Sequence, residues 1–93
     1  MKRQVDCNSE VITNAVKGIL DKHGIAGSMR LTYRDFAEQV CSTCNKLGWG
    51  SQEAASEVGR LMEEYQSRYD ADEAILKEIV AKAFQACLGG LAQ

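Results

Sequence analysis

The sequence predicts one all-α domain, and three observations lead to that fold class. Apolar residues recur at the three- and four-residue spacing of an amphipathic helix in four separate stretches. Clustered glycines lie between these stretches and near the end of the chain, where they are expected to end helices. No stretch alternates apolar and polar residues with the period of two that a half-buried strand requires. A chain of 93 residues supports one hydrophobic core, so residues 1–93 are expected to form a single helical domain.

The connections between the expected helices are short and fall near residues 24–31, 48–51 and 69–72. Short connections make successive helices antiparallel, so we expect a four-helix bundle with up-down-up-down topology. An irregular orthogonal array of the same helices is the alternative, because the connection around Gly48 and Gly50 is tight and rich in glycine.

The first two helices carry local start signals. Ser9 is a favourable N-cap residue, and the first helix is expected to begin there. For the second helix, Thr32 is the expected N-cap, with Asp35 three residues later as an acidic variant of the capping box. Leu31 and Phe36 occupy the two positions of a hydrophobic staple. We therefore expect the second helix to begin at Thr32.

The remaining helix boundaries follow from further caps and glycines. Gly48 is expected to end the second helix, and Ser51 to cap the third. The fourth helix is expected to begin near Asp70 or Asp72 and to end at the glycines 89–90. The apolar positions expected to face the core are Val11, Ile12, Ala15, Val16, Ile19, Leu20, Phe36, Ala37, Val40, Cys41, Cys44, Leu47, Ala54, Ala55, Val58, Leu61, Met62, Tyr65, Tyr69, Ile75, Leu76, Ile79, Val80, Ala83, Phe84, Cys87 and Leu88.

Charge and hydropathy exclude several classes of function. The formal net charge is −2, and the 11 basic residues are scattered along the chain. A nucleic-acid-binding protein usually carries a basic face, so we expect neither nucleic-acid binding nor attraction to an anionic membrane. No apolar run has the length of a signal peptide or a membrane-spanning helix. The expected compartment is the cytoplasm, where thiols stay reduced.

Four cysteines are expected to gather at one end of the bundle. Cys7 lies just before the first helix, Cys41 and Cys44 lie in the last turns of the second, and Cys87 lies in the last turn of the fourth. Four converging thiolates could bind zinc or an iron–sulfur cluster, and pairs of them could form a redox switch. Cysteine also packs as a small hydrophobe. The sequence leaves open whether these four bind metal, form disulfides or only pack.

Aromatic residues supply a second candidate surface. Trp49 stands between two glycines in a turn, where it either covers the end of the core or serves as a binding anchor. Tyr65 and Tyr69 could add to a protein-binding surface, although tyrosines at helical spacing often form the rim of a core. His23 is the single histidine and is expected to interact with the end of the first helix. No catalytic dyad or phosphate-binding loop is apparent in the sequence.

These observations favour a small, non-enzymatic interaction or regulatory protein that binds another protein, or itself, through a helical face. The first alternative is a helical protein that binds metal or senses redox state through its four cysteines. The second alternative is a DNA-binding helix-turn-helix formed by the second and third helices. The acidic start of the third helix, from Ser51 to Glu57, argues against this alternative.

Overall fold

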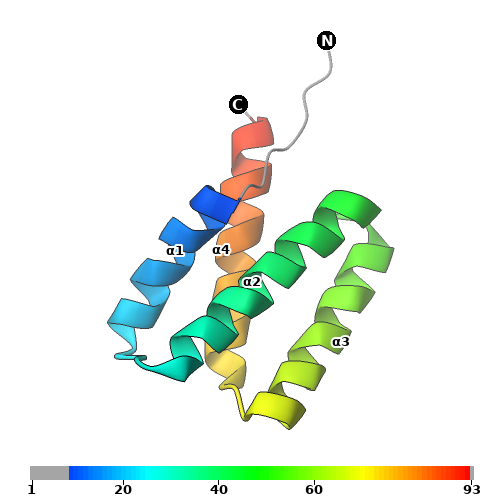
Figure 1. The fold of residues 1–93 in the computed structure, drawn as a ribbon. Helices are drawn as coiled ribbons and strands as arrows, with labels where there is room; N and C mark the ends of the chain where they lie inside the picture. The colour runs from blue at the N-terminus through cyan, green and yellow to red at the C-terminus, as the bar shows by residue number, and fades with distance from the viewer. Residues whose placement is uncertain (1–8, 93) are drawn as a thin grey trace.

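A computed structural model describes residues 9–92 of the protein, and the side chains of residues 12–85. This part of the chain contains no strand and forms four helices (Figure 1). The helices are α1 (Ser9–Lys22), α2 (Ser28–Leu47), α3 (Gln52–Tyr69) and α4 (Glu73–Ala92). The predicted all-α class is confirmed. No helix in the described part is both long enough and apolar enough to cross a lipid bilayer.

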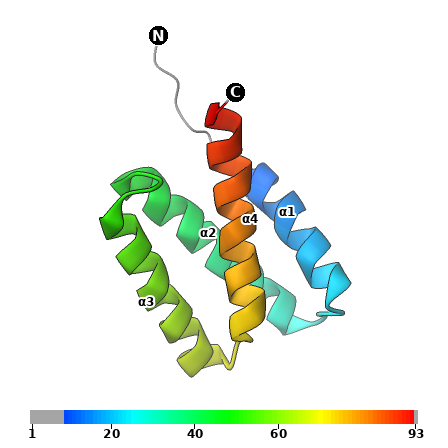
Figure 2. The same cartoon turned by 180° about the vertical axis from the view of Figure 1, so that it is seen from behind.

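The four helices pack with α2 between α1 and α3, and with α4 behind them (Figures 1 and 2). Helix α4 contacts all three other helices, whereas α1 and α3 do not touch within the described residues. In Figure 1, α1 and α3 run downward while α2 and α4 run upward. In that view α2 is strongly inclined to α4, and the two helices contact each other across the domain. Because helices of a regular bundle are nearly parallel or antiparallel and α2 is inclined to α4, the finer expectation of a regular up-down-up-down bundle stays a prediction.

The predicted cap of α3 is present, and α4 begins close to Asp72, one of its two predicted starts. The Ser51 hydroxyl accepts a hydrogen bond from the backbone N–H of Ala54 at 3.0 Å, which satisfies a donor at the start of α3. The carboxylate of Asp72 accepts from the N–H of Ala74 at 2.9 Å at the start of α4. Asp70, the other predicted start of the fourth helix, instead caps the end of α3 in the left-handed conformation, with φ of 59°.

The predicted start of the second helix is wrong by one turn. Helix α2 begins at Ser28 after Gly27, whose φ of 70° favours glycine. Thr32 lies inside the helix, and its hydroxyl donates to the carbonyl of Ser28, four residues earlier, at 3.4 Å. Leu31 is 63% exposed. It therefore does not form the predicted hydrophobic staple.

The predicted end of the fourth helix is also wrong, since α4 continues through Gly89 and Gly90 to Ala92. Its Ile75, Leu76 and Ile79 face the core as predicted. The fully described core is one contiguous cluster to which every helix contributes. Its largest fully buried side chains are Phe36, Ile12, Leu20, Leu76, Ile79, Val16, Val40 and Cys44.

Candidate functional site

The cysteines for which the structure describes side chains lie near the end of α2. Cys44 is completely buried, and Cys41 is 7% exposed. Cys87 belongs to α4, but its side chain lies outside the described residues, as does all of Cys7. Among the described side chains, no group of three or more histidine, cysteine, aspartate or glutamate residues could hold a metal ion. The predicted four-cysteine cluster, and with it a zinc or iron–sulfur site, stays a prediction.

A chain of contacts joins Cys41 to α4 through the turn after α2. The side-chain amide of Asn45 donates to Cys41 Sγ at 3.7 Å, and Trp49 Nε1 donates to Asn45 Oδ1 at 2.8 Å. The Trp49 ring meets Phe84 of α4 edge to face, with centroids 4.9 Å apart. Trp49 is half-buried against the core. It therefore covers this end of the domain, and this contact ties the turn to α4.

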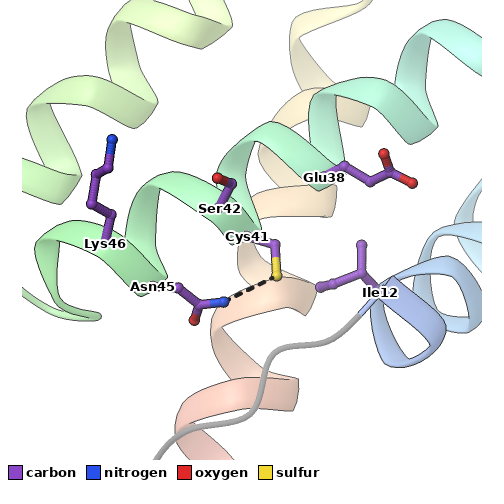
Figure 3. A pocket seen from close by; sticks show the side chains of 6 residues that line it. All are labelled: Ile12, Glu38, Cys41, Ser42, Asn45 and Lys46. Carbon is purple, nitrogen blue, oxygen red and sulfur yellow. Dashed lines mark hydrogen bonds between the residues drawn. The ribbon is translucent and has the colours of Figure 1, made fainter.

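A shallow hollow of about 510 Å³ opens beside Cys41, between α1 and the outer side of α2 (Figure 3). In Figure 3 the sulfur of Cys41 lies between the amide of Asn45 and the side chain of Ile12 from the first turns of α1. The described residues that line it are Ile12, Glu38, Cys41, Ser42, Asn45 and Lys46. Cys44 does not line this hollow. The two cysteines of α2 therefore differ in their access to solvent.

The tyrosines gather at the opposite end of α2. Tyr33 is buried, and its hydroxyl accepts from the backbone N–H of Asp72 at 2.8 Å. The buried Tyr65 donates its hydroxyl to Asp35 Oδ2 at 2.5 Å, and its ring meets Phe36 edge to face at 5.2 Å. These contacts hold the end of α3 and the start of α4 against the first turns of α2. Tyr65 belongs to the core in this structure and does not form an open surface.

Tyr69 differs from the other two tyrosines because it is 42% exposed. Its ring lies 5.2 Å from that of Tyr65, tilted by 43°. Among the described residues, Tyr69 and Leu31 are the exposed large hydrophobic side chains. Leu31 lies in the first turns of α2 and Tyr69 is the last residue of α3, so both belong to the end of the domain held by Tyr65.

Burial and the hydrogen bond to Asp35 raise the pKa of Tyr65 well above its usual value of about 10. Above about pH 10 the unfolded chain loses this proton while the folded protein retains it, so stability falls as pH rises. We expect the free energy of unfolding to decrease above pH 10, and we expect Tyr65→Phe to reduce that decrease. Urea unfolding between pH 8 and 11 measures both. Tyr69→Phe is the matched control, and an identical pH profile for all three proteins would contradict the prediction.

The side chain of His23 contacts a carboxylate from another helix. Its Nε2 lies 2.8 Å from Glu78 Oε1 of α4, and Lys22 bonds to the other oxygen of the same carboxylate. Lys22 first, and His23 second, hold the pKa of Glu78 below its usual range. These exposed contacts tie the end of α1 to α4. The sequence predicted only an interaction of His23 with its own helix, because the facing helix could not be identified.

The chain was compared with protein-family models, curated proteins and solved structures, and none of the three comparisons gave a match.

The sequence does not predict the contacts that α2 makes with other helices at its two ends. With Thr32 as the N-cap, Tyr33 falls outside the predicted apolar stripe. A helix begun one turn earlier places Tyr33 four residues before Ala37, on the buried face. The hollow beside Cys41 has no such sequence signal. It depends on how α1 and α2 are placed side by side, which neither helix encodes alone.

Proposed function

We propose that this protein is a small, non-enzymatic interaction or regulatory protein. It binds another protein, or a second copy of itself, through the end of the domain that carries Leu31 and Tyr69. The observation that carries this proposal is the exposure of Tyr69 beside a fixed ring. Tyrosine is enriched among the residues that dominate protein interfaces. The cytoplasm is the compartment we propose for this interaction.

Preorganisation of the aromatic side chain Tyr69 supports this proposal. Tyr69 packs on Tyr65, which is itself fixed by its bond to Asp35 and by the ring of Phe36. A side chain that is already ordered loses less conformational entropy when a partner covers it. Leu31 adds apolar area that the folded domain leaves in water. Binding through this end therefore gains from apolar burial at a reduced entropic cost.

Photo-crosslinking tests this proposal. A photoreactive amino acid at position 69 is expected to form a defined adduct in the native host, or between copies of the purified protein. The same amino acid at position 52 is the matched control, because Gln52 is exposed at the other end of α3. Absence of an adduct at position 69, or equal adducts at both positions, would contradict the proposal.

Thiol chemistry is the second candidate function, and the hollow beside Cys41 favours it. A DNA-binding helix-turn-helix has less support. Helices α2 and α3 contact each other at both ends. Phe36 packs on Tyr65 at one end, and at the other end a second, separate hollow is lined by residues of both helices, among them Leu47 and Glu57. Such antiparallel packing differs from the crossing of about 90–120° in a helix-turn-helix.

Duplex DNA is expected to bind weakly or undetectably at physiological salt. The described basic side chains include several already paired with carboxylates, such as Arg60 with Glu57 and Lys77 with Glu73. Among residues 12–85, few basic groups therefore remain to displace counterions from phosphates. Fluorescence anisotropy with labelled duplexes measures this directly. Submicromolar, sequence-dependent binding would show that the prediction is wrong.

A further inference from the structure

We propose that the partner that covers Tyr69 is a basic segment of a protein, with the guanidinium of an arginine stacked on the Tyr69 ring. This inference rests on the proposed function and names the chemistry of the partner at the same end of the domain. The surface that binds the segment consists of Asp35, Tyr69, Asp70 and Asp72, and is named the Tyr69 surface. Its ring and its carboxylates recognise the cations of the segment together.

Negative charge is concentrated in the part of the chain around Tyr69. Residues 63–73 contain one basic residue, Arg68, and five acidic residues: Glu63, Glu64, Asp70, Asp72 and Glu73. The formal charge of this segment is −4, whereas that of the whole chain is −2, so the remaining residues together carry +2. Opposite charge across an interface steers association and disfavours partners of like charge. The charge of this end therefore selects a basic partner.

Ion pairs inside the domain neutralise part of this negative charge. Arg68 lies 3.7 Å from Glu64, and Lys77 lies 3.2 Å from Glu73. Three other exposed carboxylates at this end make no ion pair with any described residue: those of Asp35, Asp70 and Asp72. An approaching basic segment therefore meets three carboxylates whose charge the domain itself does not neutralise.

The three carboxylates belong to different elements that meet around Tyr69. Asp70 directly follows Tyr69 and ends α3, and Asp72 caps the start of α4 through Oδ1. Asp35 of α2 accepts the hydroxyl of Tyr65 through Oδ2, and the ring of Tyr65 lies 5.2 Å from that of Tyr69. Asp35 and Asp72 each use one carboxylate oxygen in these hydrogen bonds. The other oxygen of each can accept from a partner.

The ring of Tyr69 gives this surface a place for a cation. Tyr69 is 42% exposed, and its packing on Tyr65 orders the ring. The face of an aromatic ring attracts a cation within about 6 Å of its centroid. Arginine fits better than lysine, because its planar guanidinium stacks on a ring and also pairs with a carboxylate through two N–H groups. An arginine on Tyr69 therefore bonds to the ring and to a carboxylate together.

The basic residues near this surface leave that place open. Arg68 pairs with Glu64, one turn earlier in α3. Arg34 is exposed and directly precedes Asp35, but it forms no ion pair within the described part of the chain. None of the described lysines and arginines stacks on Tyr69. The cation that completes the surface therefore comes from a partner.

A basic peptide tests this inference. The probe is a fluorescein-labelled octapeptide of alternating arginine and glycine, and fluorescence anisotropy measures its binding to the full-length protein. The matched peptide carries citrulline, the neutral isostere of arginine, at the same positions. We expect the arginine peptide to bind at least about tenfold more tightly, because several exposed ion pairs form at once and each contributes up to about fivefold. Raising the salt concentration from about 50 mM to about 500 mM is expected to weaken its binding, because salt screens exposed charges.

Two substitutions remove charge from the surface and retain the structural role of each residue. Asparagine tolerates the left-handed conformation at position 70 and is a favourable N-cap at position 72. The double variant Asp70→Asn/Asp72→Asn is expected to bind the arginine peptide at least about threefold more weakly than wild type. Glu53→Gln is the matched control and is expected to bind as wild type does, because Glu53 is exposed at the other end of α3.

Tyr69→Leu tests the ring separately from the carboxylates. Leucine keeps an apolar side chain at this position but has no aromatic face for a cation. The variant is expected to bind the arginine peptide about two- to fivefold more weakly, and the citrulline peptide as wild type does. Circular dichroism establishes that each variant is folded. If the double variant is not folded, Asp70→Asn alone tests the charge.

Equal affinities for the arginine and citrulline peptides would overturn the inference. So would an unchanged affinity in either the charge variant or Tyr69→Leu, or an equal loss in Glu53→Gln. A dimer of the purified protein that Tyr69→Ala abolishes would assign the surface to a second copy, which overturns the basic partner but leaves the proposed function standing. Failure of the proposed function is a separate result, namely the absence of an adduct at position 69 in the crosslinking experiment.

Discussion

Replacement of Ile79 by alanine is expected to lower the free energy of unfolding by about 2–5 kcal/mol. Ile79 lies in α4, which, like α2, contacts the three other helices, and its side chain is completely buried. Truncation removes buried apolar atoms and leaves a cavity that four packed helices cannot fully close. Because single domains are typically stable by about 5–15 kcal/mol, this change removes a large share of the stability. Urea unfolding followed by circular dichroism measures it.

Leu31→Ala is the matched control, because it also shortens an aliphatic side chain within a helix. Leu31 is mostly exposed, so its truncation is expected to change stability by no more than about 0.5 kcal/mol. Equal losses for Ile79→Ala and Leu31→Ala would contradict the assignment of α4 to the centre of the core.

Phe36→Ala is expected to cost about 3–5 kcal/mol. The ring of Phe36 is completely buried and meets the ring of Tyr65 edge to face. Its removal therefore opens a cavity and also weakens the packing that orders Tyr65 and, through it, Tyr69. Chemical denaturation gives the loss of stability, and near-ultraviolet circular dichroism reports the loosened tyrosines.

Tyr69→Ala provides the comparison for Phe36→Ala, since it removes an aromatic ring that the fold leaves partly in water. Its expected cost is below about 1.5 kcal/mol. A Phe36→Ala variant as stable as Tyr69→Ala would show that Phe36 does not occupy the core position described above.

Local signals in the sequence predicted the parts of the fold that depend on local chemistry. Ser51 could be recognised as a cap because its hydroxyl needs only the N–H of Ala54, three residues away. The start of α2 could not be recognised in this way. Its second turn includes Tyr33, which is held by the backbone of Asp72, 39 residues later in the chain. Thr32 resembles a cap locally, but the helix begins four residues before it, at Ser28.

The same distinction applies to the candidate sites. Helix spacing predicted that Cys41 and Cys44 share the apolar side of α2, and both are buried. Their unequal access depends on Ile12, which α1 brings to the hollow. Tyr65 and Tyr69 were predicted together as a surface, yet Asp35 fixes one of them inside the core. Pairings between helices decide these outcomes, and a single helical stripe does not specify its partner.

The most direct test of the proposed function is the affinity for the protein that crosslinks to position 69, or for a second copy, measured by calorimetry. Tyr69→Ala is expected to weaken this binding by about tenfold or more, because exposed aromatic anchors carry much of an interface's energy. Gln52→Ala, at the other end of α3, is expected to bind as wild type does. Unchanged affinity in a folded Tyr69→Ala variant, or a greater loss in Gln52→Ala, would contradict the proposal that this end of the domain binds the partner.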